Sequence, residues 1–429
     1  MKINFEVKQK DLYAYILGFS STLYIFMIRG IPIFYYIAIL GIFLFGIKRK
    51  MPNGLLIGYA ACMVVSALLN FFITDYKKTL IFSIIMLAAD IVLIIQFGTT
   101  MKKSIPWYIH GLKHSCYFQL GWCFLQFGLY RFIGLDINGL IFKDSLHTVE
   151  TASRFLNGKI VLTGLCWHPS NMVPILLLIF LFSNNFIVWF ACLFVVINMQ
   201  SSTAIIIVLI AVMVKCFMLL FDRYSEGVTE KKVFILVLMM LCIVAVLVVT
   251  DAGNSILNDV TRLYNRLSGT KTDVGTDMST KAHQSYYLLF PEVWNNSNII
   301  QKLFGYGPGL SGIPITAITG QFSSIGAWVV ESDIMNSIYG MGIIGTITVY
   351  AYIIQLLFNA KKDRAILFCI VIPLLTAGIT YNLQYYWVFF MLSVLIICKD
   401  NNYSIKALFS NDEKINRKLF CSFRKRVKA

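Results

Sequence analysis

Residues 79–98 read TLIFSIIMLAADIVLIIQFG, a stretch in which Asp90 is the one charged side chain. A helix needs roughly 20 mostly apolar residues to cross the hydrocarbon core of a membrane. Similar runs recur along the whole chain, so the sequence predicts an all-α polytopic membrane protein. We expect about twelve transmembrane helices, at residues 11–28, 31–47, 53–74, 79–98, 115–135, 170–183, 186–199, 202–221, 233–250, 333–357, 365–380 and 383–398.

The sixth and seventh of these runs are short, and only Ser183-Asn184-Asn185 divides them, so they form either one bent hairpin or a pair of half-helices. The first run follows Lys2, Lys8 and Lys10, as a signal peptide would. No small-residue cleavage site follows it, and we interpret it as an uncleaved anchor.

The composition excludes a soluble enzyme and a disordered protein. Of the 429 residues, 58% are hydrophobic and 14% are charged, whereas about a quarter of a soluble domain is charged. Most of the ten cysteines lie within apolar runs, which argues against a disulfide framework or a zinc site. We expect no metal and no cofactor.

The net charge of +16 reports on membrane topology. With the N-terminus in the cytoplasm, the inner segments hold 24 of the 37 lysines and arginines and the outer segments hold 12. Nine of those 12 belong to the two long outer segments, which the positive-inside rule largely ignores. Both termini are therefore predicted to be cytoplasmic. No fold or motif of a nucleic-acid-binding protein accompanies the charge, so nucleic acid is not an expected partner.

This topology divides the chain into six regions. They are N-terminal transmembrane helices (1–135), an extracytoplasmic loop (136–170), central helices (171–250), a large extracytoplasmic loop (251–332), C-terminal helices (333–398) and a basic cytoplasmic tail (399–429). Loops this long are usually functional or disordered. The large loop is rich in aromatic and apolar residues, so we expect it to pack on itself or on the membrane face.

Candidate site residues gather in the two outer segments. The first segment carries Arg154, Lys159 and His168, and Asn171 follows directly after it. Here the alternative is an ordinary outer loop, in which Ser170 or Asn171 caps the following helix.

In the second segment Arg262 and Arg266 are four residues apart and share a face if the helix continues. Their alternative role is to contact lipid head groups. Glu331 and Asp333 stand at the mouth of the tenth span, where carboxylates also complement the helix dipole.

Three further features have structural and functional interpretations. The glycine-rich stretch 303–312 is predicted to be a turn-rich connection, because no strand precedes it and no Lys-Ser/Thr follows. Gly340, Gly342 and Gly345 are expected to allow close helix packing. Asp90 is either functional, as ionisable residues in spans usually are, or protonated and hydrogen-bonded to Ser83 or a neighbouring helix.

Arginines on the outer face suit a pyrophosphate, because guanidinium binds phosphate through two parallel hydrogen bonds. A membrane protein that binds pyrophosphate away from ATP fits glycosyl transfer from a polyprenyl-linked donor. In that reaction Arg154 and Arg266 would stabilise the leaving group. Glu331 or Asp333 would take the proton of the acceptor hydroxyl.

The order Arg154, Gly158, His168-Pro169-Ser170-Asn171, Ser201-Ser202-Thr203-Ala204, Leu303-Phe304-Gly305-Tyr306-Gly307, Glu331-Ser332-Asp333 and Gly342-Ile343-Ile344-Gly345 resembles the O-antigen polymerase (Wzy) and ligase superfamily. The resemblance covers roughly residues 150–350. It implies a C-type glycosyltransferase-like fold in the bacterial plasma membrane, with the active face outside.

The implied activity is transfer of a growing glycan from undecaprenyl pyrophosphate onto a lipid-linked repeat unit, yielding O-antigen or capsule. Implied partners are the lipid-linked oligosaccharide, the bilayer and a chain-length regulator membrane protein. Ligases of the superfamily typically carry a histidine where Glu331-Ser332-Asp333 stands, which favours polymerase. The alternatives are an O-antigen ligase, a lipid-linked oligosaccharide flippase, and a non-catalytic channel or receptor subunit.

Overall fold

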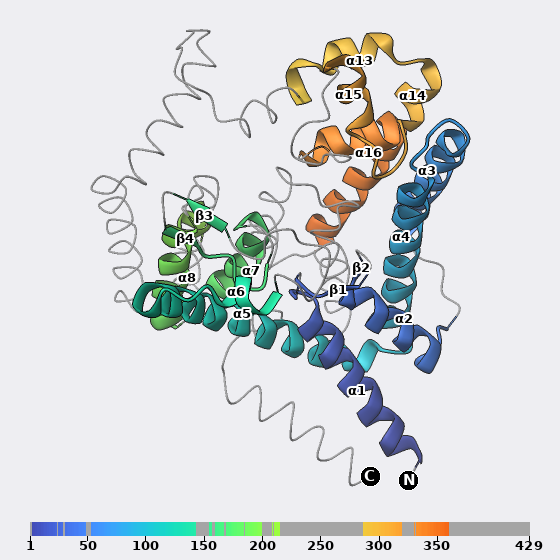
Figure 1. Cartoon of the computed structure of the whole chain (residues 1–429). Coiled ribbons are helices and arrows are strands. Elements are labelled where there is room, and N and C mark those ends of the chain that lie inside the picture. Colours follow the sequence, from blue (N-terminus) through green and yellow to red (C-terminus); the bar gives the residue numbers. More distant parts are fainter. Residues whose placement is uncertain are drawn as a thin grey trace. The chain divides into compact units, whose positions relative to one another are not determined.

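The computed structural model describes residues 2–48, 53–142, 154–156, 159–166, 169–199, 208–214, 286–319, 330 and 332–359, except residues 24, 29, 30, 184 and 209. Within these ranges the chain is mostly helical (Figure 1), with two short antiparallel ribbons. It divides into two compact units, Met1–Ser115 with Asp277–Ala429, and Cys116–Thr276.

The first unit contains α1 (Lys2–Ser20), β1 (Met27–Ile28), β2 (Ile31–Pro32), α2 (Ile33–Phe45), α3 (Gly54–Phe71), α4 (Lys77–Gly98), the 3₁₀-helix η1 (Lys102–Ser104), the start of α5 (Ile105–Ile133), α13 (Phe290–Asn296), α14 (Ile299–Phe304), α15 (Ile313–Thr319) and α16 (Asp333–Asn359). The second unit contains the rest of α5, α6 (Ile137–Phe142), β3 (Arg154–Leu156), β4 (Lys159–Val161), α7 (Pro169–Phe182) and α8 (Phe186–Asn198).

Three described helices, α3, α4 and α16, are long and apolar enough to cross a membrane. They match the spans predicted at 53–74, 79–98 and 333–357, so the membrane class of the protein is supported. The spans predicted at 233–250, 365–380 and 383–398 lie outside the described residues, as does most of the run at 202–221.

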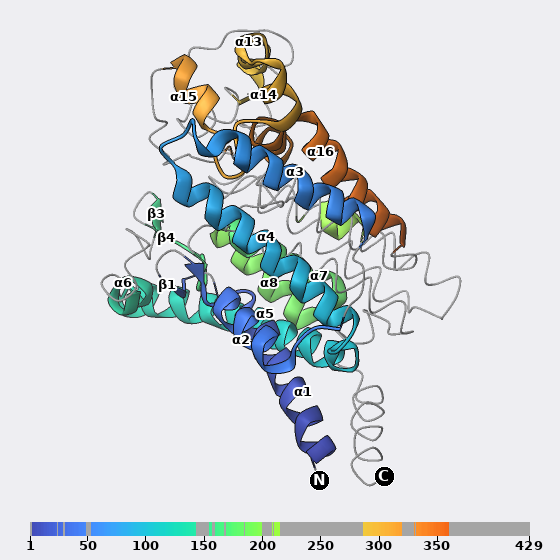
Figure 2. The same ribbon diagram turned by 90° about the vertical axis from the view of Figure 1, so that its right-hand side faces the viewer.

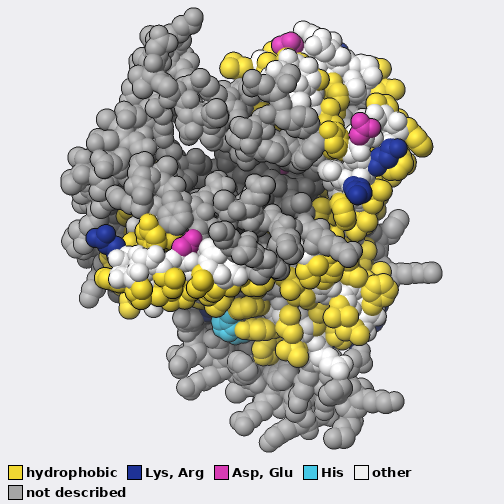
Figure 3. All heavy atoms as spheres, in the orientation of Figure 1, with side chains coloured by type: hydrophobic (Ala, Val, Ile, Leu, Met, Phe, Trp, Pro, Cys, Tyr) yellow, Lys and Arg dark blue, Asp and Glu magenta, His cyan; other side chains and the backbone are white. Residues whose placement is uncertain are grey.

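The exposed surface of the described part agrees with a lipid environment. Large apolar side chains are exposed on several helices (Figure 3), and Phe43, Phe72 and Ile73 are each more than 80% exposed. Such side chains would be costly to leave in water at roughly 25 cal/mol per Å². Their exposure is natural where the surrounding medium is hydrocarbon.

The first predicted span needs correction. We expected a helix over 11–28, but α1 ends at Ser20, and Met27 pairs with Pro32 in the β1–β2 ribbon. The hydroxyls of Ser20 and Ser21 both donate to the carbonyl of Leu17, at 2.9 and 3.0 Å. Such side-chain bonds compete with helical backbone bonds and favour a helix end here.

The helices α1 and α5 cross in close contact through two glycines. A Cβ atom on Gly18 would overlap the backbone of Tyr108 and lie 2.9 Å from the amide of Leu112. A Cβ atom on Gly111 would in turn overlap the backbone of Tyr15. Small residues at a crossing let two backbones approach in this way. Asp11 hydrogen-bonds to Ser104 just before α5, and Thr22 just after α1 hydrogen-bonds to Ser115 of α5. The two helices therefore run in the same direction, as the predicted order of the first and fifth spans requires.

The helices α3 and α16 lie side by side (Figure 2) and run in opposite directions. Asn53, at the start of α3, donates to Gln355 near the end of α16 at 2.7 Å. Ser66, toward the other end of α3, donates to the carbonyl of Gly340 at 3.0 Å. Opposite directions are predicted for the third and tenth spans, so this part of the expected arrangement is confirmed.

The sixth and seventh runs form two packed helices, α7 and α8, of 14 and 13 residues. Trp189 closes the connection by donating to the carbonyl of Ser183 at 2.8 Å. The amide of Leu162, before α7, donates to the carbonyl of Asn198 at the end of α8 at 3.2 Å, so the pair returns to where it began. Each helix is shorter than the roughly 20 residues of a full span. The two runs therefore form a hairpin of two half-length helices, which agrees with both alternatives.

Candidate active site

A sharp bend in α16 organises the candidate site. Gly342 has φ 68° and ψ −172°, which interrupts the helical conformation. In a straight helix the Cα atoms of Asp333 and Tyr350 would be about 25 Å apart. The Tyr350 hydroxyl nevertheless donates to Oδ2 of Asp333 at 2.8 Å. The two halves of α16 are therefore folded toward each other.

The segment that follows α14 satisfies the backbone groups that the bend releases. The amide of Tyr306 donates to the carbonyl of Tyr339 at 2.7 Å, and the amide of Gly307 donates to that of Gly340 at 3.0 Å. Ser66 of α3 also donates to the Gly340 carbonyl. Irregular backbone at membrane depth is tolerated where protein groups pair with it in this way.

Two glycines face each other at this contact. A Cβ on Gly305 would lie 2.5 Å from the carbonyl oxygen of Gly340, and a Cβ on Gly342 would overlap the backbone of Leu303. The expectation of close packing at Gly342 is confirmed. At Gly345 the three atoms nearest to an added Cβ all belong to Met341 of the same helix, so contact with another helix stays a prediction there.

Polar side chains surround the start of α16. Asp333 lies in the first turn of α16, where a carboxylate complements the helix dipole as the sequence predicts, and its side chain is fully buried. Ser332 and Tyr287 share a hydrogen bond of 2.7 Å. Ser311 donates to Oδ1 of Asn336 at 2.5 Å and accepts from the amide of Val330 at 2.9 Å.

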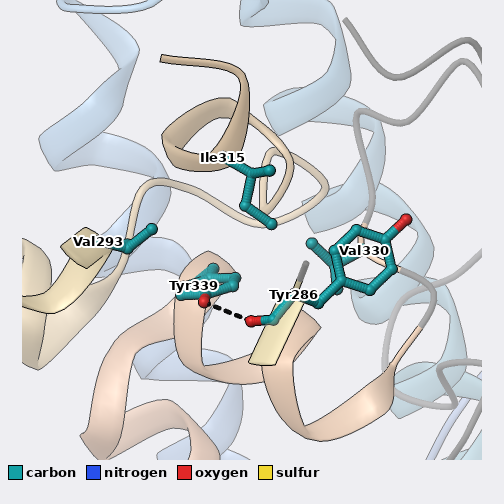
Figure 4. Packing of buried hydrophobic residues seen from close by; sticks show 5 residues of the cluster. All are labelled: Tyr286, Val293, Ile315, Val330 and Tyr339. Carbon is teal, nitrogen blue, oxygen red and sulfur yellow. Dashed lines mark hydrogen bonds between the residues drawn. The ribbon is translucent and has the colours of Figure 1, made fainter. Parts of the chain in front are cut away.

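An apolar cluster supports these polar groups from α13, α15 and α16. Its buried members are Tyr286, Val293, Ile315, Val330 and Tyr339 (Figure 4). The Tyr339 hydroxyl donates to the carbonyl of Tyr286 at 2.8 Å, which ties the segment before α13 to α16. Residues 286–319, part of the segment predicted to lie outside, therefore pack on one another and on α16.

The glycine-rich stretch is a turn-rich connection, as predicted. Gly305, Gly307 and Gly309 all have positive φ, between α14 and α15. Asn70 of α3 donates to the carbonyl of Gly305 at 3.2 Å, and Leu310 is buried against Ala67 and Leu80. The stretch therefore anchors the segment 286–319 to α3 and α4.

The structure describes the side chains of two predicted site residues, Asp333 and Asn171. They belong to different units, Asp333 to the first and Asn171 to the second. Arg154 and Lys159 lie in the β3–β4 ribbon, where Arg154 pairs with Val161 and Lys159 with Leu156. The remaining predicted residues lie outside the described part of the chain: His168, Arg262, Arg266 and Glu331.

Asn171 does not have the capping role weighed in the sequence analysis. It lies in the first turn of α7 and is fully buried. Neither its amide oxygen nor its amide nitrogen makes a hydrogen bond in the described structure. An N-cap side chain would accept from a backbone amide of the helix.

Asp90 is buried in α4, where the Tyr35 hydroxyl of α2 donates to its Oδ2 at 3.2 Å. Bonding to a neighbouring helix is therefore confirmed. Bonding to Ser83 is wrong, because that hydroxyl donates to the carbonyl of Thr79 at 2.9 Å. Asp90 thus has a structural partner within the first unit.

The sequence did not indicate Tyr350 or Ser311 as site residues. Tyr350 is 17 positions from Asp333, and only the bend brings them together. The sequence could have indicated Asn336, because it lies three residues after Asp333 and residues three apart on a helix are neighbours.

Among the described residues, no group of three His, Cys, Asp or Glu side chains is placed to hold a metal ion. No protein-family model matches the chain, and the search of curated proteins gives no match either. Proposals about function therefore rest on the residues and on the geometry described above.

Proposed function

We propose that this protein is a polysaccharide polymerase of the bacterial plasma membrane. It transfers a growing O-antigen or capsule glycan from undecaprenyl pyrophosphate onto a lipid-linked repeat unit at the outer face. The observation that carries the proposal is the buried Asp333 carboxylate, held by Tyr350 at the start of α16. A carboxylate fixed in this way is suited to orient and deprotonate an acceptor hydroxyl.

In the proposed reaction the acceptor oxygen forms a bond to the anomeric carbon of the donor sugar. The bond from that carbon to the pyrophosphate breaks, and its electron pair leaves with the pyrophosphate. The acceptor proton passes to Asp333 or Glu331, and Tyr350 positions Asp333. Arg154 and Arg266 neutralise the departing pyrophosphate, with Lys159, His168, Asn171 and Arg262 as further substrate contacts.

The test uses cells that lack the native gene and carry one variant each. We expect D333A to shorten the glycan by the largest factor, since removal of a general base costs about 10²–10⁴-fold in rate. Y350F keeps the ring and loses only the donor, so a smaller loss is expected. D75A is the matched control, because Asp75 is exposed in the connection between α3 and α4.

Full-length polymer at normal protein level from D333A, E331A, R154A and R266A would refute the site assignment. The location of the unused repeat unit tests the activity class. Without a polymerase, single repeat units reach the outer face but are not joined into polymer, whereas without a flippase they remain on the cytoplasmic face.

A further inference from the structure

The second unit contains a cluster of buried polar side chains around the turn at residues 162–166. Its members are Gln119 and Gln126 on α5, Asn138 on α6, Thr163 in the turn and Asn171 on α7. Each of the five is at most 1% exposed. Gln119 and Gln126 fall inside the run predicted to span the membrane at 115–135. Polar residues at such positions are usually functional or hold protein backbone in place.

Part of the cluster has a structural role. Oε1 of Gln119 accepts from the amide of Leu165 at 2.7 Å, and Oε1 of Gln126 accepts from the amides of Thr163 and Gly164, both at 3.3 Å. Asn138 donates to the carbonyl of Gly164 at 2.8 Å. These bonds satisfy the buried backbone of the turn.

The turn is also packed tightly against α5. Gly164 has φ 61°, and a Cβ there would lie 2.6 Å from Oε1 of Gln119. The glutamine side chains and the turn therefore form one docked assembly.

Four polar atoms beside this assembly are left over. They are Nε2 of Gln126, Oγ1 of Thr163, and Oδ1 and Nδ2 of Asn171, which are buried and make no hydrogen bond in the described structure. A buried polar atom without a partner destabilises the fold relative to a satisfied one. Buried groups of this kind normally bond to an ordered water or a ligand.

Two of these residues lie side by side. Gln126 is bonded to the Thr163 amide, so its Nε2 lies close to the Thr163 side chain. Asn171 lies in the first turn of α7, the helix that follows the turn at 162–166.

The chemistry of the cluster selects its ligand. Amides and a hydroxyl offer both donors and acceptors, and the five members include no cation to attract phosphate and no carboxylate. This combination suits hydroxyl groups, which donate and accept at once. We propose that Asn171, Thr163 and Gln126 bind neutral sugar hydroxyls of the lipid-linked repeat unit. This inference rests on the proposed function for the identity of that ligand.

N171L and T163V test the proposal, because each removes leftover polar atoms and keeps the number and branching of the side-chain heavy atoms. If those atoms serve only the ligand, both variants unfold at the same temperature as the native protein or higher. Their polymer output falls by about tenfold or more, the equivalent of one hydrogen bond of about 1.4 kcal/mol. Q119L is the control, since it leaves the Leu165 amide unpaired and lowers the unfolding temperature.

A binding measurement separates this proposal from the proposed function. The probe is the lipid-linked oligosaccharide extracted from cells lacking the gene, and undecaprenyl phosphate without sugar is its control. We expect the oligosaccharide to raise the unfolding temperature of the native protein, and this shift to be lost in N171L and T163V. Undecaprenyl phosphate should change the unfolding temperature of the native protein and of both variants by the same amount.

An equal oligosaccharide shift in native protein and both variants, with unchanged polymer, would overturn the inference and indicate bound water only. A large loss of stability in N171L would also overturn it, since it would show that Asn171 has structural partners. A third outcome separates the two proposals. If cells carrying the native gene make no polymer, but the oligosaccharide raises the unfolding temperature of the native protein and not of the variants, the proposed function fails and the sugar site stands.

Discussion

Replacing Gly342 by Ala should disrupt the bend of α16. The conformation at φ 68° and ψ −172° is accessible essentially to glycine alone, and another residue there costs about 1–3 kcal/mol. The new Cβ would also lie closer than 3.0 Å to the backbone of Leu303 and Phe304, so the two chains must separate. Separation weakens the bonds from Tyr306 and Gly307 to α16, at about 1 kcal/mol each.

Together these effects amount to about 3–5 kcal/mol, a large part of the 5–15 kcal/mol by which proteins are typically stable. At about 1–2 °C per kcal/mol for a chain of this length, the unfolding temperature should fall by at least about 3 °C. G58A is the matched control, because its Cβ would meet Thr348 of α16 at an ordinary 3.7 Å. Alanine in that helix interior should raise stability by roughly 0.5–1 kcal/mol.

Unfolding can be followed with a thiol-reactive fluorescent dye on protein purified in detergent. The described part of the chain has five buried free cysteines, which become reactive only on unfolding: Cys62, Cys116, Cys123, Cys166 and Cys192. G342A should also lose polymer output, because the Asp333–Tyr350 bond depends on the bend. If G342A unfolds within about 2 °C of the native protein, the glycine argument is refuted.

Two further predictions use the same assay. G111A should destabilise the protein by about 1–3 kcal/mol, because its Cβ overlaps the backbone of α1. G121A on the same helix meets nothing within 4 Å in the described structure and should be neutral or stabilising. Equal changes in unfolding temperature for the two variants would refute the close contact between α1 and α5. Burial lowers the pKa of His110, ahead of the predicted span in α5, to about 4 from the ordinary 6.5, with His114 and Lys113 adding to the effect. The stability that neutral His110 confers is complete above pH 6.5 and is lost as the pH falls toward about 4. The unfolding temperature of H110Q should therefore depend less on pH over this range than that of the native protein. Parallel curves of unfolding temperature against pH for both proteins would contradict the lowered pKa of His110.

The apolar runs identified the helices that are long and regular. Those predicted at 53–74, 79–98 and 333–357 are present as α3, α4 and α16. Hydropathy suffices here because each run is a local property of about 20 residues. The relative directions of α3 and α16 also followed, since they depend only on the order of the spans.

Helix ends and partial helices were less accessible to sequence. The end of α1 at Ser20 depends on two serine hydroxyls inside an apolar run. The α7–α8 hairpin was one of two open alternatives, because Ser183 and Asn185 are compatible with both.

Within the candidate site, the sequence identified Asp333 by its place at the mouth of a span, and Asn171 by its place next to the first outer segment. Their environments were not predictable. Asp333 meets Tyr350 only because α16 bends, and the buried amides of Gln119 and Gln126 meet the turn at 162–166 from positions some 40 residues away in the chain.

The sequence by itself therefore determined the membrane class, most described helices and the candidate carboxylate. The tertiary structure decided which polar groups face one another. The physical reason is that hydropathy is read along one segment, whereas a bend such as that at Gly342 is stabilised by backbone hydrogen bonds from Tyr306 and Gly307, which are distant in sequence.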